Sequence, residues 1–202
     1  MKPTVVFWYE FASTYSYLSA MRIDEAAASA DVAVEWKPFL LGPIFRAQGW
    51  ETSPFNIYPA KGRYMIRDIS RMASARGIPF QMPPKFPTNG LKAARLTIAA
   101  RSQGADAAFS RAVYAAHFGK GLDIADDDVL TDCLTTAGLD ADEVRLLSVD
   151  AAVKAELRAN TEEAAALGIF GAPSFTTPDG EVFWGDDRLE QALDWARKRA
   201  PN

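Results

Sequence analysis

Apolar and polar residues alternate with different periods in different parts of the chain. Residues Thr4 to Phe11 are dense in β-branched and aromatic types, and Val32 to Phe39 repeat that composition, which predicts two strands. Between them, Ala20 to Ala30 carry apolar and small residues at helical spacing. A strand, a helix and a second strand in this order predict a β-α-β unit with parallel strands.

The middle of the chain has helical patterns and no strand pattern. After Gly42-Pro43, prolines and glycines interrupt the sequence as far as Gly90 and leave one clear helix, Gly62 to Ala75. From Leu91 to about Leu167 the sequence is alanine-rich with helical periodicity. This stretch therefore predicts several packed helices.

Strand patterns return near the C-terminus. Ser174 to Thr177 and Glu181 to Trp184 flank Pro178-Asp179-Gly180, which predicts a hairpin, and Asp187 to Lys198 have the pattern of a last helix. The order β-α-β, helices, β-β-α predicts an α/β fold. We expect residues 1–42 and 168–202 to form one sheet domain, with 43–167 inserted in it as a helical domain.

Composition narrows the classes of function. The 202 residues are 49% hydrophobic and carry a net charge of -4, so they can bury a core and give no sign of a basic nucleic-acid surface. Cys133 is the single cysteine, which excludes an intramolecular disulfide and a cysteine metal cluster and favours a reducing compartment. The first apolar run is broken by Glu10 and is too short for a signal peptide or a membrane span. We therefore expect a cytoplasmic protein without membrane, nucleic-acid or metal partners.

Two serines stand where a redox motif would have sulfur atoms. In the stretch FWYEFASTYSYL, Ser13 and Ser16 follow the first strand with the spacing of a Cys-x-x-Cys pair. Ser13 is expected at the start of a helix, where unpaired backbone N–H groups and the helix dipole favour an anion. Serine is also a preferred helix N-cap. The hydroxyl of Ser13 is therefore either a cap or a donor to an anionic ligand atom.

A proline stands directly before a strand that should be central. In GAPSF, Pro173 precedes the strand that begins at Ser174, and proline is poorly tolerated inside central strands. A cis Ala172–Pro173 peptide bond would explain its position, and a trans proline that opens the strand is the alternative.

These features together resemble a known family. A strand followed by x-x-S-x-x-S-x-L, an alanine-rich helical middle, GIFGAPSF and FWGDDRLE resemble the thioredoxin-like proteins of the DsbA superfamily. Within it, the chain is most similar to 2-hydroxychromene-2-carboxylate isomerases and kappa-class glutathione transferases. The resemblance runs from Val5 to Leu193. It implies a thioredoxin-like fold with an inserted all-helical domain, assembled as a homodimer.

The resemblance also implies a glutathione site. It implies that Ser13 hydrogen-bonds the glutathione sulfur, that Pro173 is cis and that the backbone of Ala172 pairs with the tripeptide. Lys61, in YPAKGRYM, matches a lysine that contacts the glycine carboxylate of glutathione.

Other matches to the family's glutathione site carry substitutions. Asp186 and Asp187, in WGDDR, fall where the family binds the γ-glutamyl end of glutathione. Thr14 stands in place of a usual proline, Thr52 in place of an asparagine near glutathione, and Asp186 in place of a usual serine or asparagine. The extra carboxylate at Asp186 could alter how the glutathione ammonium is held.

The implied activity is that of a glutathione-dependent cis-trans isomerase acting on 2-hydroxychromene-2-carboxylate or a similar aromatic-derived conjugated keto acid. A thiol at a helix N-terminus beside a hydroxyl donor ionises more readily, and its thiolate can add to a conjugated carbonyl and later leave. A kappa-class-like glutathione transferase and a non-catalytic thioredoxin-like binding protein are the alternatives. Dithiol exchange is excluded because both cysteines of the motif are absent.

A few further residues have two interpretations each. Trp36, Phe39 and the aromatic residues that follow them either belong to the core or wall an aromatic-substrate pocket. Asn89 matches a position that faces substrate in the family, with turn formation as the alternative. His117 is expected to have a structural role at a helix end, where a positive charge would favour the dipole, with acid–base chemistry as the alternative. Asp126 to Asp128 are expected to cap a helix.

Overall fold

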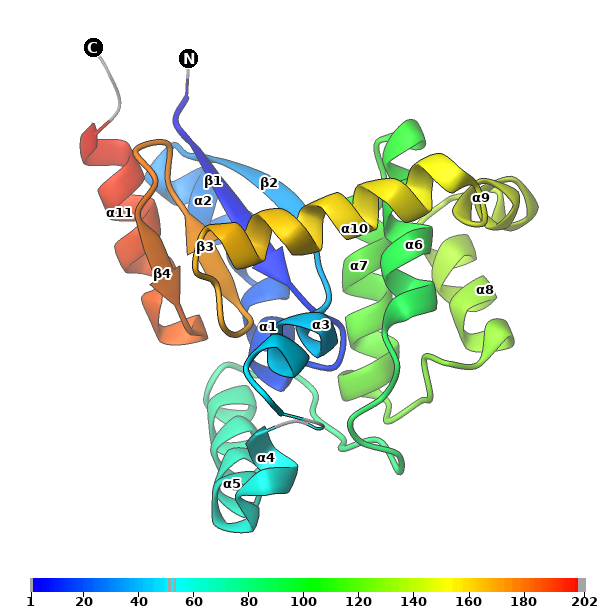
Figure 1. The fold of residues 1–202 in the computed structure, drawn as a ribbon, viewed down its shortest axis with the longest axis horizontal. Helices are drawn as coiled ribbons and strands as arrows, with labels where there is room; N and C mark the ends of the chain where they lie inside the picture. The colour runs from blue at the N-terminus through cyan, green and yellow to red at the C-terminus, as the bar shows by residue number, and fades with distance from the viewer. Residues whose placement is uncertain (1, 51, 53, 200–202) are drawn as a thin grey trace.

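A four-stranded sheet lies at the centre of the computed structural model, which describes the chain except for residues 1, 51, 53 and 200–202 (Figure 1). Its strands run in the order β2-β1-β3-β4. The parallel pair β1 and β2 and the antiparallel neighbours β3 and β4 agree with the predicted β-α-β unit and C-terminal hairpin. The strands are β1 (Thr4–Tyr9), β2 (Ala33–Pro38), β3 (Ser174–Thr176) and β4 (Val182–Trp184).

The connection between the parallel strands is made of two helices, where the sequence pattern predicted one. Helices α1 (Thr14–Ala20) and α2 (Ile23–Ala30) are separated at Met21 and Arg22. Arg22 has φ -137° and ψ -11°, outside the helical region, and its guanidinium group bonds to Asp186 near the other end of the chain. A contact between segments far apart in sequence thus coincides with the break between the helices.

Helices make up the regular structure of the described residues between 43 and 167, as the alanine-rich pattern predicted. Helices α3 (Leu41–Ala47) and α4 (Pro54–Ile57) were not predicted, because prolines and glycines interrupt the helical pattern of their sequences. Pro43 lies in the first turn of α3, where proline is tolerated. The helices are α3 (Leu41–Ala47), α4 (Pro54–Ile57), α5 (Pro59–Ala75), α6 (Leu91–Ala100), α7 (Asp106–Tyr114), α8 (Asp127–Thr136), α9 (Ala141–Ser148) and α10 (Ala151–Ala166), with a 3-10 turn η1 (Arg101–Gln103) and a π-helical turn η2 (Ala115–Gly119).

The chain ends in a helix that packs on the sheet. A 3-10 turn, η3 (Asp186–Arg188), leads into α11 (Leu189–Arg199), which packs against α2 and β1. The strands of the sheet thus come from the two ends of the chain. The division into domains stays a prediction, and residues 1 and 200–202 of the expected sheet domain lie outside the described residues.

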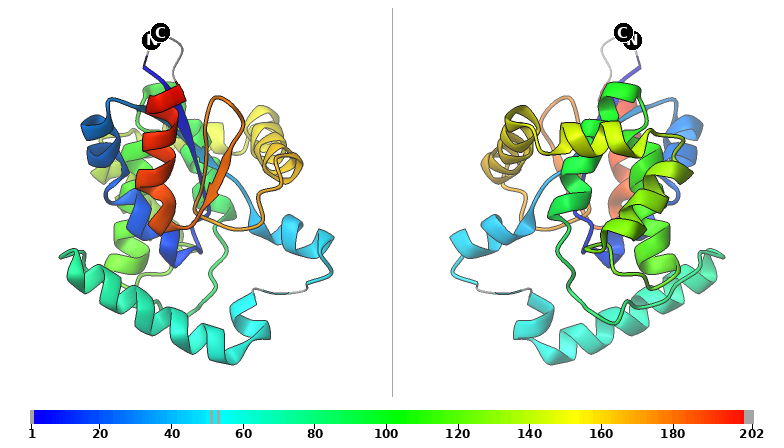
Figure 2. Two further views of the ribbon diagram at one scale, coloured as in Figure 1. Left: turned by 90° about the vertical axis from the view of Figure 1, so that its left-hand side faces the viewer. Right: turned by 90° about the vertical axis from the view of Figure 1, so that its right-hand side faces the viewer.

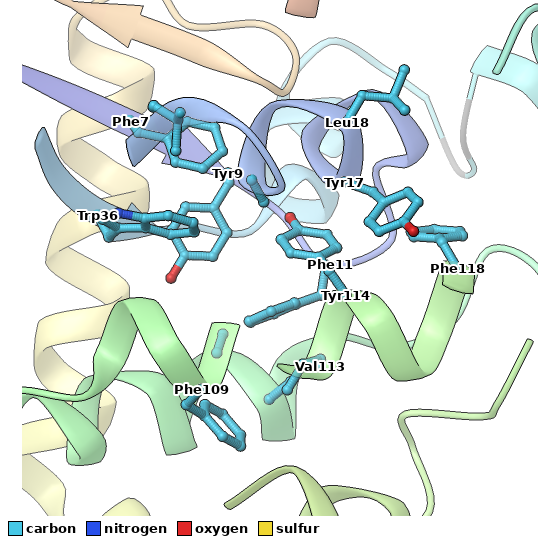
Figure 3. Close-up of a cluster of buried hydrophobic side chains, with 14 of the residues drawn as sticks. Phe7, Tyr9, Phe11, Tyr17, Leu18, Trp36, Phe109, Val113, Tyr114 and Phe118 are labelled. Carbon is cyan, nitrogen blue, oxygen red and sulfur yellow. The ribbon is translucent and has the colours of Figure 1, made fainter. Parts of the chain in front are cut away.

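The larger of two hydrophobic clusters among the described residues joins the sheet to the helices of the middle (Figure 3). Phe7 of β1 stacks on Phe175 of β3 with ring centroids 5.5 Å apart. Tyr9 lies two residues further along the same face of β1, and its ring centroid is 6.1 Å from that of Tyr114 in α7. The hydroxyl groups of Tyr9 and Ser110 are hydrogen-bonded at 2.7 Å. These contacts fix the end of β1, and therefore the turn that follows it. No helix in the described part of the chain combines the length and apolarity needed to cross a bilayer.

Helix α5 lies at the edge of the molecule, apart from helices α6 to α9 (Figures 1 and 2). It packs mainly against α4 and α1. Tyr15 of α1 donates a 2.9 Å hydrogen bond to Asp68 of α5, and Thr14 donates a 3.4 Å bond to the sulfur of Met65. Thr14, which replaces the usual proline of the family, therefore links two helices. Between α5 and the end of β1 lies the candidate site.

Candidate functional site

A cavity of about 1240 Å³ opens at the end of β1, between α3, α5 and the segments that precede α6 and η3. Each residue that the sequence assigned to glutathione lines it, and so does Asn89. The glutathione residues are Ser13, Thr52, Lys61, Ala172, Pro173, Asp186 and Asp187. Segments far apart in the sequence therefore meet around one space.

Ser13 makes both local and long-range contacts. It is the N-cap of α1, and its Oγ accepts a 3.1 Å hydrogen bond from the backbone N–H of Ser16. The same hydroxyl donates a 2.8 Å bond to the carbonyl oxygen of Ala172. The peptide bond between Ala172 and Pro173 is cis, as expected, and Phe86–Pro87 at the cavity edge is cis as well. The cap interpretation thus holds, and the hydroxyl also faces the cavity.

The Pro173 segment is held against the segment that follows β4. The backbone N–H of Gly185 donates a 3.0 Å bond to the carbonyl of Pro173. Trp184 lies across Gly171 so closely that a Cβ at that glycine would be 2.4 Å from the indole nitrogen. Trp184 also packs on Phe170, with ring centroids 4.8 Å apart. An aromatic wall therefore stands beside the cis-proline.

Lys61 projects from the first turn of α5 on the opposite side of the cavity. Its ammonium lies 4.9 Å from the ring centroid of Tyr58. Among the described residues, no carboxylate is within ion-pair distance of it. Its charge is therefore available to an anionic ligand in the cavity. Thr52 is exposed on the same side.

Glu10 is a cavity residue that the sequence reasoning used only as an argument against a membrane span. Its carboxylate accepts a 3.0 Å bond from the backbone N–H of Ala12. Burial raises the pKa of Glu10 to about 7, and the bond from Ala12 only partly opposes that effect. An acid that interrupts the apolar run FWYEFA was the available signal.

Comparison with known proteins identifies the fold family. Residues 4–195 match the DSBA-like thioredoxin domain. The chain belongs to this family.

Individual relatives agree with this DSBA-like assignment. The chain is 31% identical to a 2-hydroxychromene-2-carboxylate isomerase of Sphingobium xenophagum over 191 residues, which are 94% of this chain and 96% of the relative. It is 28% identical to glutathione S-transferase kappa 2 of Caenorhabditis elegans over 96% of this chain and 92% of the relative. A solved structure of a 2-hydroxychromene-2-carboxylate isomerase superposes with a TM-score of 0.82 at 25% identity, over 97% of this chain and 95% of that one.

Asp186 has a different environment in this DSBA-like domain from the one its sequence position suggested. Only 1% of its side chain is exposed. It accepts a 2.9 Å bond from Ser19 and a 3.2 Å bond from Arg22. Arg76 lies 2.8 Å from its other oxygen, at an angle that favours charge attraction over a hydrogen bond. Two guanidinium groups thus already compensate its charge, whereas Asp187 is 66% exposed beside Arg188.

Trp36 and Phe39 do not line the cavity, contrary to their proposed role in substrate binding. Trp36 is 5% exposed and packs edge-on against Phe7, and Phe39 is fully buried against Trp8. Trp36 belongs to the larger hydrophobic cluster and Phe39 to a second one around Trp8, so both side chains are used in core packing. The cavity instead has these aromatic lining residues: Tyr15, Phe45, Trp50, Phe55, Tyr64, Phe86, Phe170 and Trp184.

The remaining candidates divide between the cavity and other regions of the DSBA-like domain. Asn89 lines the cavity and its side-chain oxygen accepts a 3.0 Å bond from Leu91 at the start of α6. His117 is buried outside the cavity with its Nδ1 2.8 Å from the carbonyl oxygen of Leu122, which agrees with a structural role, and burial lowers the pKa of its ring. Asp126 caps α8 by accepting a 2.8 Å bond from the N–H of Asp128, as expected.

Proposed function

We propose that this DSBA-like protein binds glutathione in the cavity and catalyses cis-trans isomerisation of 2-hydroxychromene-2-carboxylate or a similar aromatic-derived conjugated keto acid. The observation that carries the proposal is the hydroxyl of Ser13 at the N-terminus of α1, bonded to the carbonyl before the cis-proline. No cysteine stands in the Ser13–Ser16 motif, so the nucleophile must come from a ligand. The isomerase and glutathione-transferase relatives support the same chemistry.

The charges around the cavity fit the ends of glutathione. Lys61 offers an uncompensated cation to the glycine carboxylate, and Asp187 offers an exposed carboxylate to the γ-glutamyl ammonium. Ala172 offers backbone groups between them, next to Ser13. The carboxylate of Asp186 is buried against Arg22 and Arg76 and therefore does not hold the ammonium itself. Its role is to fix the turn that carries Asp187.

The size of the cavity leaves room for a second molecule. Small-molecule pockets commonly measure about 300 to 1,000 Å³. The cavity here is about 1240 Å³ and has an aromatic wall that includes Phe45 and Trp50, with ring centroids 5.6 Å apart. A flat conjugated substrate would pack on these rings beside the cofactor.

Bound glutathione would supply the thiolate that adds to the conjugated substrate and leaves again once the resulting single bond has rotated. The role of Ser13 is to donate a hydrogen bond to the sulfur and so favour its ionised form. The N-terminus of α1 adds its positive dipole end to the same effect, although a seven-residue helix has a short dipole.

A glutathione transferase of the kappa type is the second candidate. The 28% identity to glutathione S-transferase kappa 2 over nearly the whole chain favours it, and both activities use the same thiolate. Homodimer assembly remains an expectation from the resemblance, and a cytoplasmic location remains one from the single cysteine and the short, interrupted first apolar run. Whether the product is an isomer or a glutathione adduct separates the two enzymes.

Calorimetric titration with glutathione tests binding, and an absorbance assay with the chromene carboxylate tests isomerisation. We expect binding in the micromolar to millimolar range and turnover only when glutathione is present. S-methyl glutathione, which fills the site without a free thiol, serves as the control and should inhibit. Turnover without glutathione would contradict the role of the cofactor, and adduct formation without isomerisation would favour the transferase.

A further inference from the structure

Glu10 belongs to the same turn as Ser13. Its carbonyl oxygen accepts a 2.9 Å hydrogen bond from the backbone N–H of Ser13, and a second one of 2.9 Å from the hydroxyl of Tyr114 in α7. Its side chain folds back to the N–H of Ala12 at 3.0 Å. The carboxyl group is therefore held over the turn that carries Ser13, and it lines the same cavity.

The start of α6 approaches this carboxyl group closely. A Cβ at Gly90 would lie 3.0 Å from Oε1 of Glu10 and 3.1 Å from the Cβ of Phe11. A side chain at this position would push the carboxyl group or Phe11 by a few tenths of an ångström. Gly90 therefore leaves room for the carboxyl group at the cavity edge, where the hydrogen bond from Ala12 holds it.

Glu10 differs from the other acids of the cavity in having no cationic partner among the described residues. Arg71 pairs with Asp68, Arg22 and Arg76 with Asp186, and Arg188 with Asp187. These pairs are 2.8 to 3.3 Å long. Of the titratable groups in the described part of the chain, Tyr114 of α7 faces Glu10, and burial raises the pKa of its hydroxyl, so it is neutral.

An unpaired carboxyl group of this kind suits proton exchange at neutral pH. Burial raises the pKa of Glu10 to about 7, so the protonated and ionised forms are both populated there. General acid–base catalysis is most efficient when the pKa of the group lies near the working pH.

We propose that Glu10 is the proton donor and acceptor of this site, giving a proton to the carbonyl oxygen of the conjugated substrate and taking it back. This inference rests on the proposed function. When the conjugated system accepts the electron pair of the nucleophile, negative charge develops on its carbonyl oxygen. The Glu10 carboxyl transfers its proton there and becomes a carboxylate. It recovers the proton when the double bond re-forms and the nucleophile is expelled, so the cycle needs no external acid or base.

Glu10→Gln tests the proposal because the amide keeps the size of the side chain and an oxygen that can accept from Ala12. We expect the kcat of isomerisation to fall about 100-fold at pH 7, at the lower end of the range for losing a general acid–base group. The limb of the pH profile near neutrality should disappear. The dissociation constant of glutathione should stay within about twofold, because the carboxyl group is assigned to the substrate.

The control is Asp68→Asn, which removes another cavity carboxylate and should keep the neutral limb of the pH profile. Infrared difference spectra between wild type and Glu10→Gln measure the carboxyl titration directly, without an assay of activity. A midpoint near neutrality is expected, and a midpoint near that of an exposed glutamate would overturn the proposal. An unchanged kcat and pH profile in a folded Glu10→Gln protein would overturn it too, while leaving the glutathione function intact. If the wild type shows no glutathione-dependent turnover, both proposals fail.

Discussion

The hydroxyl of Ser13 donates its single proton to the carbonyl oxygen of Ala172, 2.8 Å away. A serine hydroxyl has one proton to donate, so donation to a bound sulfur requires the bond to Ala172 to be given up. A hydrogen bond to a charged group is worth about 1.5 to 3 kcal/mol and one between neutral groups about 0.5 to 1.5 kcal/mol. The net gain is the difference, on the order of 1 kcal/mol. Thiolate stabilisation by Ser13 is thus an exchange of hydrogen-bond partners.

Ser13→Ala should raise the pKa of the bound glutathione thiol by about one unit and lower turnover about tenfold, because one pKa unit corresponds to roughly 1.4 kcal/mol. The ultraviolet absorbance of the thiolate, titrated with pH, measures this shift. Ser16→Ala is the matched control, since Ser16 is buried in the first turn of α1 and does not line the cavity. A normal thiol pKa and full activity in Ser13→Ala would reduce Ser13 to a helix cap.

Lys61→Ala should raise the dissociation constant of glutathione about three- to fivefold, because an exposed ion pair contributes about 1 kcal/mol or less. Arg63→Ala removes a charge from the same helix outside the main cavity and should leave binding unchanged. The glycine ethyl ester of glutathione lacks the carboxylate that Lys61 is proposed to bind, so it tests the role of the lysine directly. Calorimetry should give the same affinity for the ester in wild type and Lys61→Ala. A Lys61 effect that persists with the ester would mean that the lysine holds another group.

Asp186→Asn should mainly lower the stability of the protein, whereas Asp187→Asn should mainly weaken its binding of glutathione. Asp186 is buried on Arg22 and Arg76, so its loss leaves guanidinium groups without their counter-charge. We expect Asp186→Asn to lower the free energy of unfolding by about 2 to 4 kcal/mol, somewhat less than for a fully buried pair because both arginines are partly exposed. Asp187→Asn should leave stability within about 0.5 kcal/mol and weaken glutathione binding. Chemical denaturation and calorimetry measure the two effects. An Asp186→Asn protein that is stable but binds glutathione poorly would show that Asp186 contacts the ligand.

Glu10 should make the stability of the protein fall as the pH rises through the acid range. Its pKa is about 7 in the folded protein and 4.5 ordinarily, so between these values the unfolded chain releases a proton that the folded chain retains. The contribution is fully present below pH 4.5 and is lost by about pH 7, with a total on the order of 3 kcal/mol. Denaturation at pH 5 and pH 8 should show that Glu10→Gln gains stability relative to wild type as the pH rises. An equal difference at both pH values would mean that the carboxyl titrates normally.

Sequence patterns were most informative where they were periodic or local. The β-branched and aromatic composition of β1 and the turn signal at Pro178 to Gly180 predicted strands that the structure has. The motif residues Ser13 and Pro173 were expected to be close, and they are, because both flank the same pair of strands.

Sequence patterns could not predict the surroundings of residues whose contacts come from distant segments of the chain. Aromatic residues look alike in sequence whether they pack inward, as Trp36 does, or line a cavity, as Trp50 does. Asp186 depends on Arg22 and Arg76, which are distant in the chain. The carboxyl group of Glu10 lies beside Gly90, the N-cap of α6, which is distant in the chain and leaves space for it.

Helix α5 carries the cation of the site but is attached to the rest of the molecule mainly through α1 and α4 (Figure 2). Segments with few buried contacts open locally at a lower free energy than the global unfolding of the protein. The amides of α5 should therefore exchange with deuterium sooner than those of β1, which is buried between its neighbours. Glutathione that contacts Lys61 and Ala172 together would bridge α5 to the sheet, so its binding should slow exchange in α5 while leaving β1 unaltered. Amide exchange in α5 would therefore show whether glutathione is bound in the cavity, without a substrate or a catalytic assay.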